Sequence, residues 1–170
     1  MDVLQKEKKR EMKTFRKLGF SNVETNDVVT ALNLMLANYQ VHYQKLRDFH
    51  WNVTGADFFD LHEQFEKEYD QVKLNIDDIA ERIRVFGKTP VSTMKEYLEM
   101  ATIKEAKRGL GADQMVAEIL NDFEIMLSFM IDVLDESQKI GDTSTNDMIT
   151  KFMKRMEKRH WMFTAFSRNN

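Results

Sequence analysis

Two histidines in the stretch RDFHWNVTGADFFDLHEQFEKEYDQ have the residue type and the surroundings of metal ligands. His50 comes first, His62 follows twelve residues later, and Glu66 stands four residues after His62. Further along, Asp77 and Glu81 are again separated by four residues. On a helix this spacing stacks two side chains on one face, about 6 Å apart. Each pair could therefore chelate one ion, and imidazole together with carboxylate suits iron, zinc or manganese.

A single helix cannot bring both pairs to the same ion. His62 and Asp77 are fifteen residues apart, which is about 22 Å along a helix, although all four residues share roughly one face. A second copy of the helix, packed antiparallel, can close the gap. The numbers of facing residues then have a constant sum, which is 143 for His62 with Glu81 and also for Glu66 with Asp77. One two-fold register would create two identical sites, and His50 would join each from the end of the preceding helix.

The elements that must position these residues are predicted to be helices. One Pro and six Gly are few for a β-rich fold, and apolar residues recur at steps of three and four. The expected N-caps of the first three helices are Thr25 or Asn26, then Asp57, then Ser92. We expect four long helices and a short one, at about 27–52, 58–86, 92–100 and 112–139, with the last helix starting near 143–145 and running to about 167.

The connection between the second and third long helices is long enough to cross the bundle from one end to the other. The chain is therefore predicted to be all-α, a ferritin-like four-helix bundle with the short helix in that crossover. The twelve Met are interpreted as core residues because they recur at helical spacing. We expect two parts, a basic N-terminal tail over residues 1–22 and the bundle domain over residues 23–170.

Other histidines in the chain are weaker candidates for a metal site. The usual ferritin-like site lies inside one bundle and needs two Glu-x-x-His pairs. This chain has one such pair, Glu157 with His160, which we interpret as a surface pair. We interpret His42 as a hydrogen-bonded helix histidine.

The simpler alternative for the five candidate ligands is a solvated helix face. Phe65 and the apolar stripe nearby favour partial burial of some of the acids, and buried carboxylates need partners.

Composition limits the remaining possibilities. The chain has 170 residues, no Cys and a net charge of −3. The lack of Cys excludes a disulfide framework and a thiolate metal site. The N-terminal stretch has no apolar core of a secretory signal, and no apolar run reaches the length of a membrane span. We therefore expect a cytoplasmic protein with no membrane partner.

The first seventeen residues carry seven basic and three acidic side chains, whereas the rest of the chain is acidic. A basic arm on an acidic body occurs in proteins that contact nucleic acid, and a solvated terminus is the simpler alternative. The candidate DNA contacts are Lys6, Lys8, Lys9, Arg10, Lys13, Arg16 and Lys17.

The chain closely resembles the Dps family of mini-ferritins, the DNA-binding proteins from starved cells, in the segments FHWNVTGADFFDLHEQFE and IDDIAER. The resemblance runs from about Asn26 to Phe166 and includes MLANYQ, GDTSTNDM and HWMFTAF. It implies a hollow shell of twelve subunits with ferroxidase sites at two-fold interfaces, which agrees with the register above. The residues that match the family's ligands are His50, His62 and Glu66 of one subunit with Asp77 and Glu81 of its neighbour. Glu66 differs mildly from the family pattern, because Asp is common at that position.

The resemblance also implies an activity. Such proteins oxidise Fe²⁺ to Fe³⁺, with hydrogen peroxide as the expected oxidant, and store the ferric mineral, which protects the cell from oxidative damage. The site can hold two metal ions, and zinc would compete for its ligands.

Trp51 matches a tryptophan beside the site, with interface packing as its alternative role. A nucleoid-associated structural protein that binds DNA is the alternative function, and a helical assembly without chemistry is a third. Acids that line an iron-uptake pore match Asp147, Asp142 and Asp135.

Overall fold

All regular structure in the described part of the chain is helical. The structure is a computed structural model, and it describes residues 19–21 and 23–167. The predicted arrangement of four long helices, with a short one between the second and third, is confirmed, and each long helix begins and ends within about two residues of its expected position. The helices are α2 (Asn26–Asn52), α3 (Phe58–Val85), α4 (Met94–Met100), α5 (Ala112–Ile140) and α6 (Thr143–Ser167).

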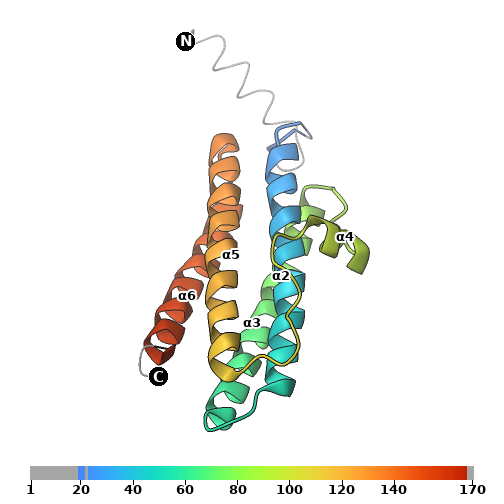
Figure 1. Ribbon diagram of the computed structural model, residues 1–170. Helices are drawn as coiled ribbons and strands as arrows, with labels where there is room; N and C mark the ends of the chain where they lie inside the picture. Colours follow the sequence, from blue (N-terminus) through green and yellow to red (C-terminus); the bar gives the residue numbers. More distant parts are fainter. Residues whose placement is uncertain (1–18, 22, 168–170) are drawn as a thin grey trace, which may run out of the picture.

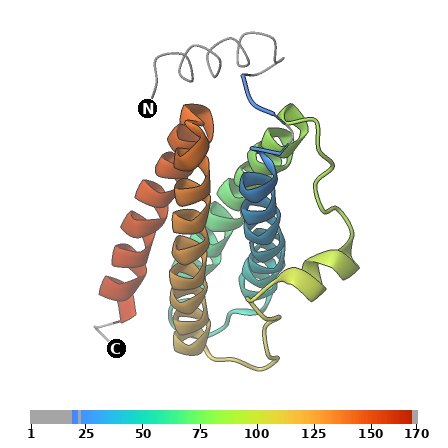
Figure 2. The same ribbon diagram turned by 90° about the horizontal axis from the view of Figure 1, so that it is seen from above.

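The long helices form two hairpins that lie side by side (Figure 1). Helix α2 packs against α3, α5 packs against α6, and contacts between α2 and α5 join the two hairpins. After α3 the chain runs along the outside of α2, where α4 lies against that helix, and it begins α5 at the opposite end of the bundle (Figures 1 and 2). This is the crossover that the length of the connection predicted.

The core is built from one apolar face of each long helix. Its largest side chains are aromatic and include Tyr39, Phe49, Phe65 and Phe123. Flexible Met side chains fill irregular gaps between these aromatic rings, and five of them are buried, namely Met35, Met115, Met126, Met130 and Met156.

Among the described helices, none is both long and apolar enough to cross a membrane.

The turns between the paired helices depend on glycine. Gly55 lies between α2 and α3 with φ +106°, and Gly141 caps the end of α5 with φ +72°. Backbone with positive φ is accessible to Gly at little cost because Gly has no Cβ. These turns are short, so each pair of helices packs antiparallel and its two inner ends stay close together.

The start of α4 differs from the prediction. Its N-cap is Thr93 rather than Ser92, because the Thr93 hydroxyl accepts from the backbone N–H of Glu96 while the Glu96 carboxylate accepts from the backbone N–H of Thr93. This capping box needs a Glu or Gln three residues after the cap. Ser92 has Lys95 at that distance, so it cannot form the reciprocal pair.

Charged side chains buried inside the bundle join the two hairpins. Lys45 Nζ of α2 lies 2.8 Å from Asp122 Oδ1 of α5, and His42 Nδ1 lies 2.9 Å from Asp122 Oδ2. Between α3 and α6, Arg155 donates to both oxygens of Glu68 at 2.9 and 3.1 Å. His42 is therefore the hydrogen-bonded helix histidine that was expected.

Candidate metal centre

His50 and His62 meet where α2 ends and α3 begins. Their rings stack with centroids 3.8 Å apart and 22° between the planes. His50 is buried and His62 is half-buried. The turn at Gly55 places the last turn of α2 beside the first turns of α3, so that two residues twelve positions apart become neighbours. Two of the five candidate ligands are therefore brought together within one chain.

Hydrogen bonds to the backbone fix the orientation of both rings. Nδ1 of His50 lies 2.8 Å from the carbonyl oxygen of His62, and Nδ1 of His62 lies 2.8 Å from the carbonyl oxygen of His50. A carbonyl can only accept, so Nδ1 carries a proton, and in the neutral ring Nε2 keeps its lone pair. Metal-binding histidines are oriented in the same way, by a hydrogen bond from the nitrogen that does not bind the metal. Both rings are therefore prepared to bind a cation through Nε2.

Glu66 lies one turn beyond His62 on the exposed surface of α3. The Tyr69 hydroxyl donates to Glu66 Oε1 at 3.2 Å, and the Tyr69 ring meets His50 edge-on with centroids 5.3 Å apart. Partial burial raises the pKa of Tyr69, and the Glu66 carboxylate raises that pKa further. The phenol is therefore protonated near neutral pH and acts as a hydrogen-bond donor to Glu66.

Asp77 and Glu81 lie about three and four helical turns beyond Glu66 on the same helix. Both are exposed, and so is Glu66, so the expected partial burial of these acids is wrong for the single chain. The reason is that the face of α3 that carries these three acids is turned away from the stripe that packs into the core. Within residues 19–21 and 23–167, no three His, Asp or Glu side chains are grouped so that they could hold a metal ion. The chain presents a histidine pair at one end of α3 and an acid pair toward the other.

Trp51 belongs to a layer of aromatic and cationic side chains beside the histidines. It is 57% exposed, and the Arg47 guanidinium lies over its ring at 4.8 Å from the centroid. Arg47 also lies over Tyr43 at 5.4 Å, and the Tyr43 ring meets Tyr69 edge-on with centroids 6.2 Å apart. This layer supports Tyr69 from the side of α2.

The three acids matched to an uptake pore have different surroundings. Asp147 and Asp135 are exposed. Asp142 is 1% exposed, and its carboxylate accepts from Arg82 Nη2 at 2.6 Å and from the backbone N–H of Thr145 at 3.1 Å. Asp142 thus caps the start of α6 and fastens it to the end of α3, which is a structural role.

A hollow of about 320 Å³ lies between α3 and α6. Its lining includes three acids, two basic side chains and apolar side chains of both helices; the charged members are Asp78, Glu81, Asp147, Arg82 and Lys151. One candidate ligand and one candidate pore residue therefore share the same open space.

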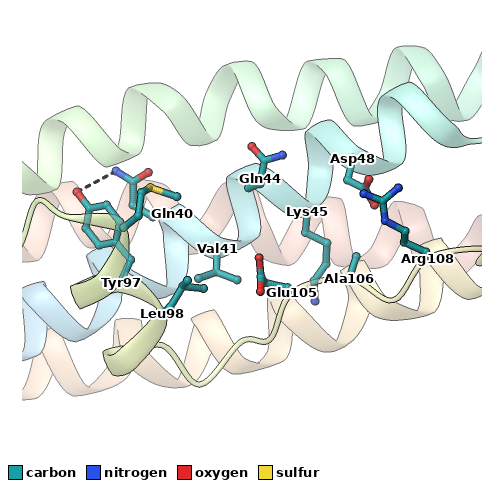
Figure 3. Close-up of a pocket in the computed structure, with 11 residues that line it drawn as sticks. Gln40, Val41, Gln44, Lys45, Asp48, Tyr97, Leu98, Glu105, Ala106 and Arg108 are labelled. Atoms are coloured by element: carbon teal, nitrogen blue, oxygen red, sulfur yellow. Dashed lines mark hydrogen bonds between the residues drawn. The ribbon is translucent and has the colours of Figure 1, made fainter.

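Figure 3 shows another hollow of about 320 Å³, between α2 and the crossover that contains α4. Gln40, Lys45 and Asp48 of α2 line one side, and Tyr97 and Arg108 line the other. None of the five candidate ligands lines this hollow. We therefore do not assign it to the metal centre.

The candidate DNA contacts lie in the tail, from Lys6 to Lys17. All seven precede residue 19 and lie outside the described residues. Their role in DNA binding stays a prediction from the sequence.

Comparisons with known proteins agree with the helical arrangement. Residues 29–169 match the family model of the ferritin-like domain. DNA protection during starvation protein 2 of Bacillus anthracis is 42% identical over 139 residues, which cover 82% of this chain and 95% of that protein. The chain is therefore a ferritin-like protein.

Solved structures narrow the class. Dps from Staphylococcus aureus has a TM-score of 0.81 and 38% identity, covering 83% of this chain and 95% of its own. The DPS protein from Vibrio cholerae O1, described as a member of a broad superfamily of ferritin-like diiron-carboxylate proteins, has a TM-score of 0.86 and 33% identity, covering 89% and 95%. The chain belongs to the Dps family.

Sequence reasoning missed two features of the centre. It did not identify Tyr69, although Tyr69 follows His62 by seven residues, or about two helical turns, and so had to lie on nearly the same face. It also did not predict the reciprocal bonds between the two histidines, because those depend on the path of the turn between them.

Proposed function

We propose that this protein is an iron-oxidising and iron-storing mini-ferritin. It oxidises Fe²⁺ to Fe³⁺ with hydrogen peroxide at sites shared between two chains, and it stores the ferric mineral inside a hollow shell of twelve chains. Iron storage and protection of DNA are consistent with its family and with the name of its Bacillus anthracis relative. The observation that carries the proposal is the histidine pair, in which His50 and His62 each bind a carbonyl through Nδ1 and keep Nε2 for iron.

A second chain completes each site in this proposal. Helix α3 packs antiparallel on its own copy, with the two-fold axis between residues 71 and 72. In this register His62 and Glu66 of one chain face Glu81 and Asp77 of the other, and His50 joins from α2. The exposure of the three acids in the single chain fits this arrangement, because a partner would cover them.

The same register pairs two residues that are not candidate ligands. Asp70 and Lys73 also have numbers that add to 143, so each would face the other residue of the second chain close to the axis. Both are exposed in the single chain and free to make such contacts. Two opposite-charge pairs near the axis would favour this register over neighbouring ones, because like charges there would repel.

Two iron ions at each site would make hydrogen peroxide a suitable oxidant. Reduction of one peroxide to two waters takes two electrons and two protons, and two Fe²⁺ ions supply both electrons without releasing a hydroxyl radical. The stacked His50 and His62 rings offer one nitrogen for each ion, and the carboxylates suit the ferric product. Few protein ligands leave coordination positions open for peroxide. Zinc would compete for the same ligands.

Iron would reach the site along the acids near the start of α6. We keep Asp147 and Asp135 as residues of an uptake pore and leave out Asp142, whose carboxylate is buried and bonded to Arg82. The hollow that Asp147 and Glu81 share supports this route, because it places a candidate pore residue beside a candidate ligand.

Shells of mixed composition test whether the site is shared. One variant, His50→Gly/His62→Gly, removes the histidine half, and a second, Asp77→Asn/Glu81→Gln, removes the acid half. Shells of either variant alone should lose fast peroxide-dependent iron oxidation. After the two are dissociated and reassembled in equal amounts, about a quarter of the sites should be intact, because half of the random two-fold pairs are mixed and each holds one complete site.

The controls for this experiment are the assembly state and the order of mixing. Sedimentation should show that both variants form the same shell as the unmodified protein. Variants that are mixed as intact shells, without dissociation, should stay inactive. If reassembled shells recover no activity, the ligands are not shared as we propose, and if either variant alone is fully active, its residues are not ligands.

DNA binding is the second candidate function. It is favoured by the seven basic side chains of the first seventeen residues and by the name of the Bacillus anthracis relative, which refers to protection of DNA. A basic arm would bind phosphates regardless of base sequence. In that case the shell would act as a nucleoid-associated structural protein as well as an iron store.

A further inference from the structure

Tyr69 contacts candidate ligands from both helices of the α2–α3 hairpin. Its hydroxyl donates to Glu66 Oε1 at 3.2 Å, and the edge of its ring meets His50 at 5.3 Å between centroids. Tyr69 is not itself one of the five candidate ligands. It is nevertheless the side chain that connects Glu66 of α3 with His50 of α2.

The Tyr69 ring is held in place by its neighbours. Tyr43 meets it edge-on with centroids 6.2 Å apart, and the Arg47 guanidinium lies over Tyr43 at 5.4 Å from the centroid. Edge-to-face contacts of this kind stabilise aromatic pairs. The position of the Tyr69 hydroxyl is therefore set from the side of α2, and Glu66 adapts to it.

Glu66 would otherwise be a poorly ordered ligand. It is exposed, and a free glutamate side chain has several rotamers whose entropy is lost when it binds an ion. The hydrogen bond from Tyr69 orders Glu66 before an ion arrives. It also uses a lone pair of Oε1, so that Oε2, which accepts nothing from Tyr69, is the oxygen more available to a cation.

We propose that Tyr69 is a positioning residue of the metal centre, which holds Glu66 through Oε1 so that Glu66 binds a divalent cation through Oε2 alone. This inference rests on the proposed function, because it takes Glu66 as a ligand. Binding through one oxygen keeps the coordination number low and leaves a position open for the oxidant. Residues that orient a ligand in this way commonly change metal affinity by about 10- to 100-fold.

Binding of Co²⁺ alone to the assembled shell tests the proposal without any iron oxidation. Tyr69→Phe keeps the ring and removes only the hydroxyl, so the fold and the contact with His50 should persist. Co²⁺ affinity should fall by about tenfold, and the visible absorption of the bound ion should weaken as the second carboxylate oxygen raises its coordination number. The matched control is Tyr97→Phe, because the Tyr97 hydroxyl contacts Gln40 rather than a candidate ligand.

The same substitution in a Glu66→Ala background separates a positioning role from a general one. If Tyr69 acts through Glu66, Tyr69→Phe should change Co²⁺ affinity by less than about twofold once Glu66 is absent. Equal losses in both backgrounds, or no loss in either, would overturn the proposal while leaving the shared site intact. If His50→Gly/His62→Gly shells bind Co²⁺ as tightly as unmodified shells, the proposed function fails and this inference fails with it.

Discussion

Lys45 and Asp122 are charged residues that the bundle removes almost completely from water, with 3% and 1% of their surfaces exposed. Their contact at 2.8 Å, with His42 on the other oxygen of Asp122, compensates for the cost of burial. A buried pair of this kind is not strongly stabilising compared with apolar residues, but removal of Lys45 leaves the buried Asp122 carboxylate without its lysine and with His42 as its remaining partner.

Lys45→Met should therefore destabilise the protein strongly. We expect a loss of about 3–5 kcal/mol of unfolding free energy and a melting temperature lower by roughly 10 °C at fixed protein concentration. Differential scanning calorimetry measures the change. Lys95→Met on the exposed surface of α4 is the matched control and should melt within about 2 °C of the unmodified protein. A Lys45→Met protein that melts like this control would show that the buried pair adds nothing to stability.

The residues of the candidate centre could be predicted from the sequence, but their contacts could not. Spacing alone selected His50, His62 and the acids of α3, because helical geometry follows directly from residue numbers. The stacking of the two imidazoles and the bond from Tyr69 to Glu66 depend on side-chain torsions and on the turn at Gly55. Neither is encoded in a spacing rule.

At the scale of elements, α3 is the helix on which the proposed assembly depends. One of its faces packs into the core, and the opposite face carries four of the five candidate ligands, all except His50, along with Asp70 and Lys73. Exposed ion pairs are each worth about 0.2–1 kcal/mol. Two-fold symmetry would create the Asp70–Lys73 contact twice in each pair of chains. One substitution would therefore change two contacts of the interface.

Charge reversal on α3 should weaken and then restore the two-fold contact. With Asp70→Lys, a lysine at position 70 of each chain faces Lys73 of the other chain, and Lys73→Asp makes both pairs acidic in the same way. Either variant should therefore assemble less completely. The double variant Asp70→Lys/Lys73→Asp restores opposite charges and should recover assembly. Analytical ultracentrifugation at low salt measures the populations, and the differences should shrink as salt is raised. Single variants that assemble normally under all conditions would refute the register.

Element boundaries were predictable because the steps of three and four between apolar residues stop where each helix ends. Gly141 caps the end of α5, and Gly55 lies in the turn after α2. The error at α4 has a simple cause, since Ser92 and Thr93 are both good caps and only Thr93 has a Glu three residues later. The arrangement of a second chain on α3 could only be inferred, because its geometry depends on a partner.

At the scale of the whole molecule, charge is divided between the tail and the body. Deletion of residues 1–17 removes seven basic and three acidic side chains and changes the net charge from −3 to −7. We expect the intact protein to shift DNA in a native gel at low salt and the deletion variant to lose this shift. The affinity of the intact protein should fall steeply with salt, because phosphate contacts release counterions.

Iron oxidation provides the control for the deletion. Since the tail supplies no candidate ligand, the deletion variant should oxidise Fe²⁺ at the rate of the unmodified protein. An intact protein that leaves DNA unshifted even at low salt would exclude the nucleoid function and leave the iron chemistry unaffected.

All five candidate ligands lie between residues 50 and 81, within the single hairpin of α2 and α3. Contacts between residues close in sequence form early in folding because little loop entropy opposes them. A nascent chain would therefore assemble its histidine pair as soon as this hairpin folds, while α5 and α6 are still being made. Such a chain would hold only half a site and could not oxidise iron until it paired with a second chain. The order of synthesis, folding and pairing would thus delay iron oxidation until a container for the mineral is being built.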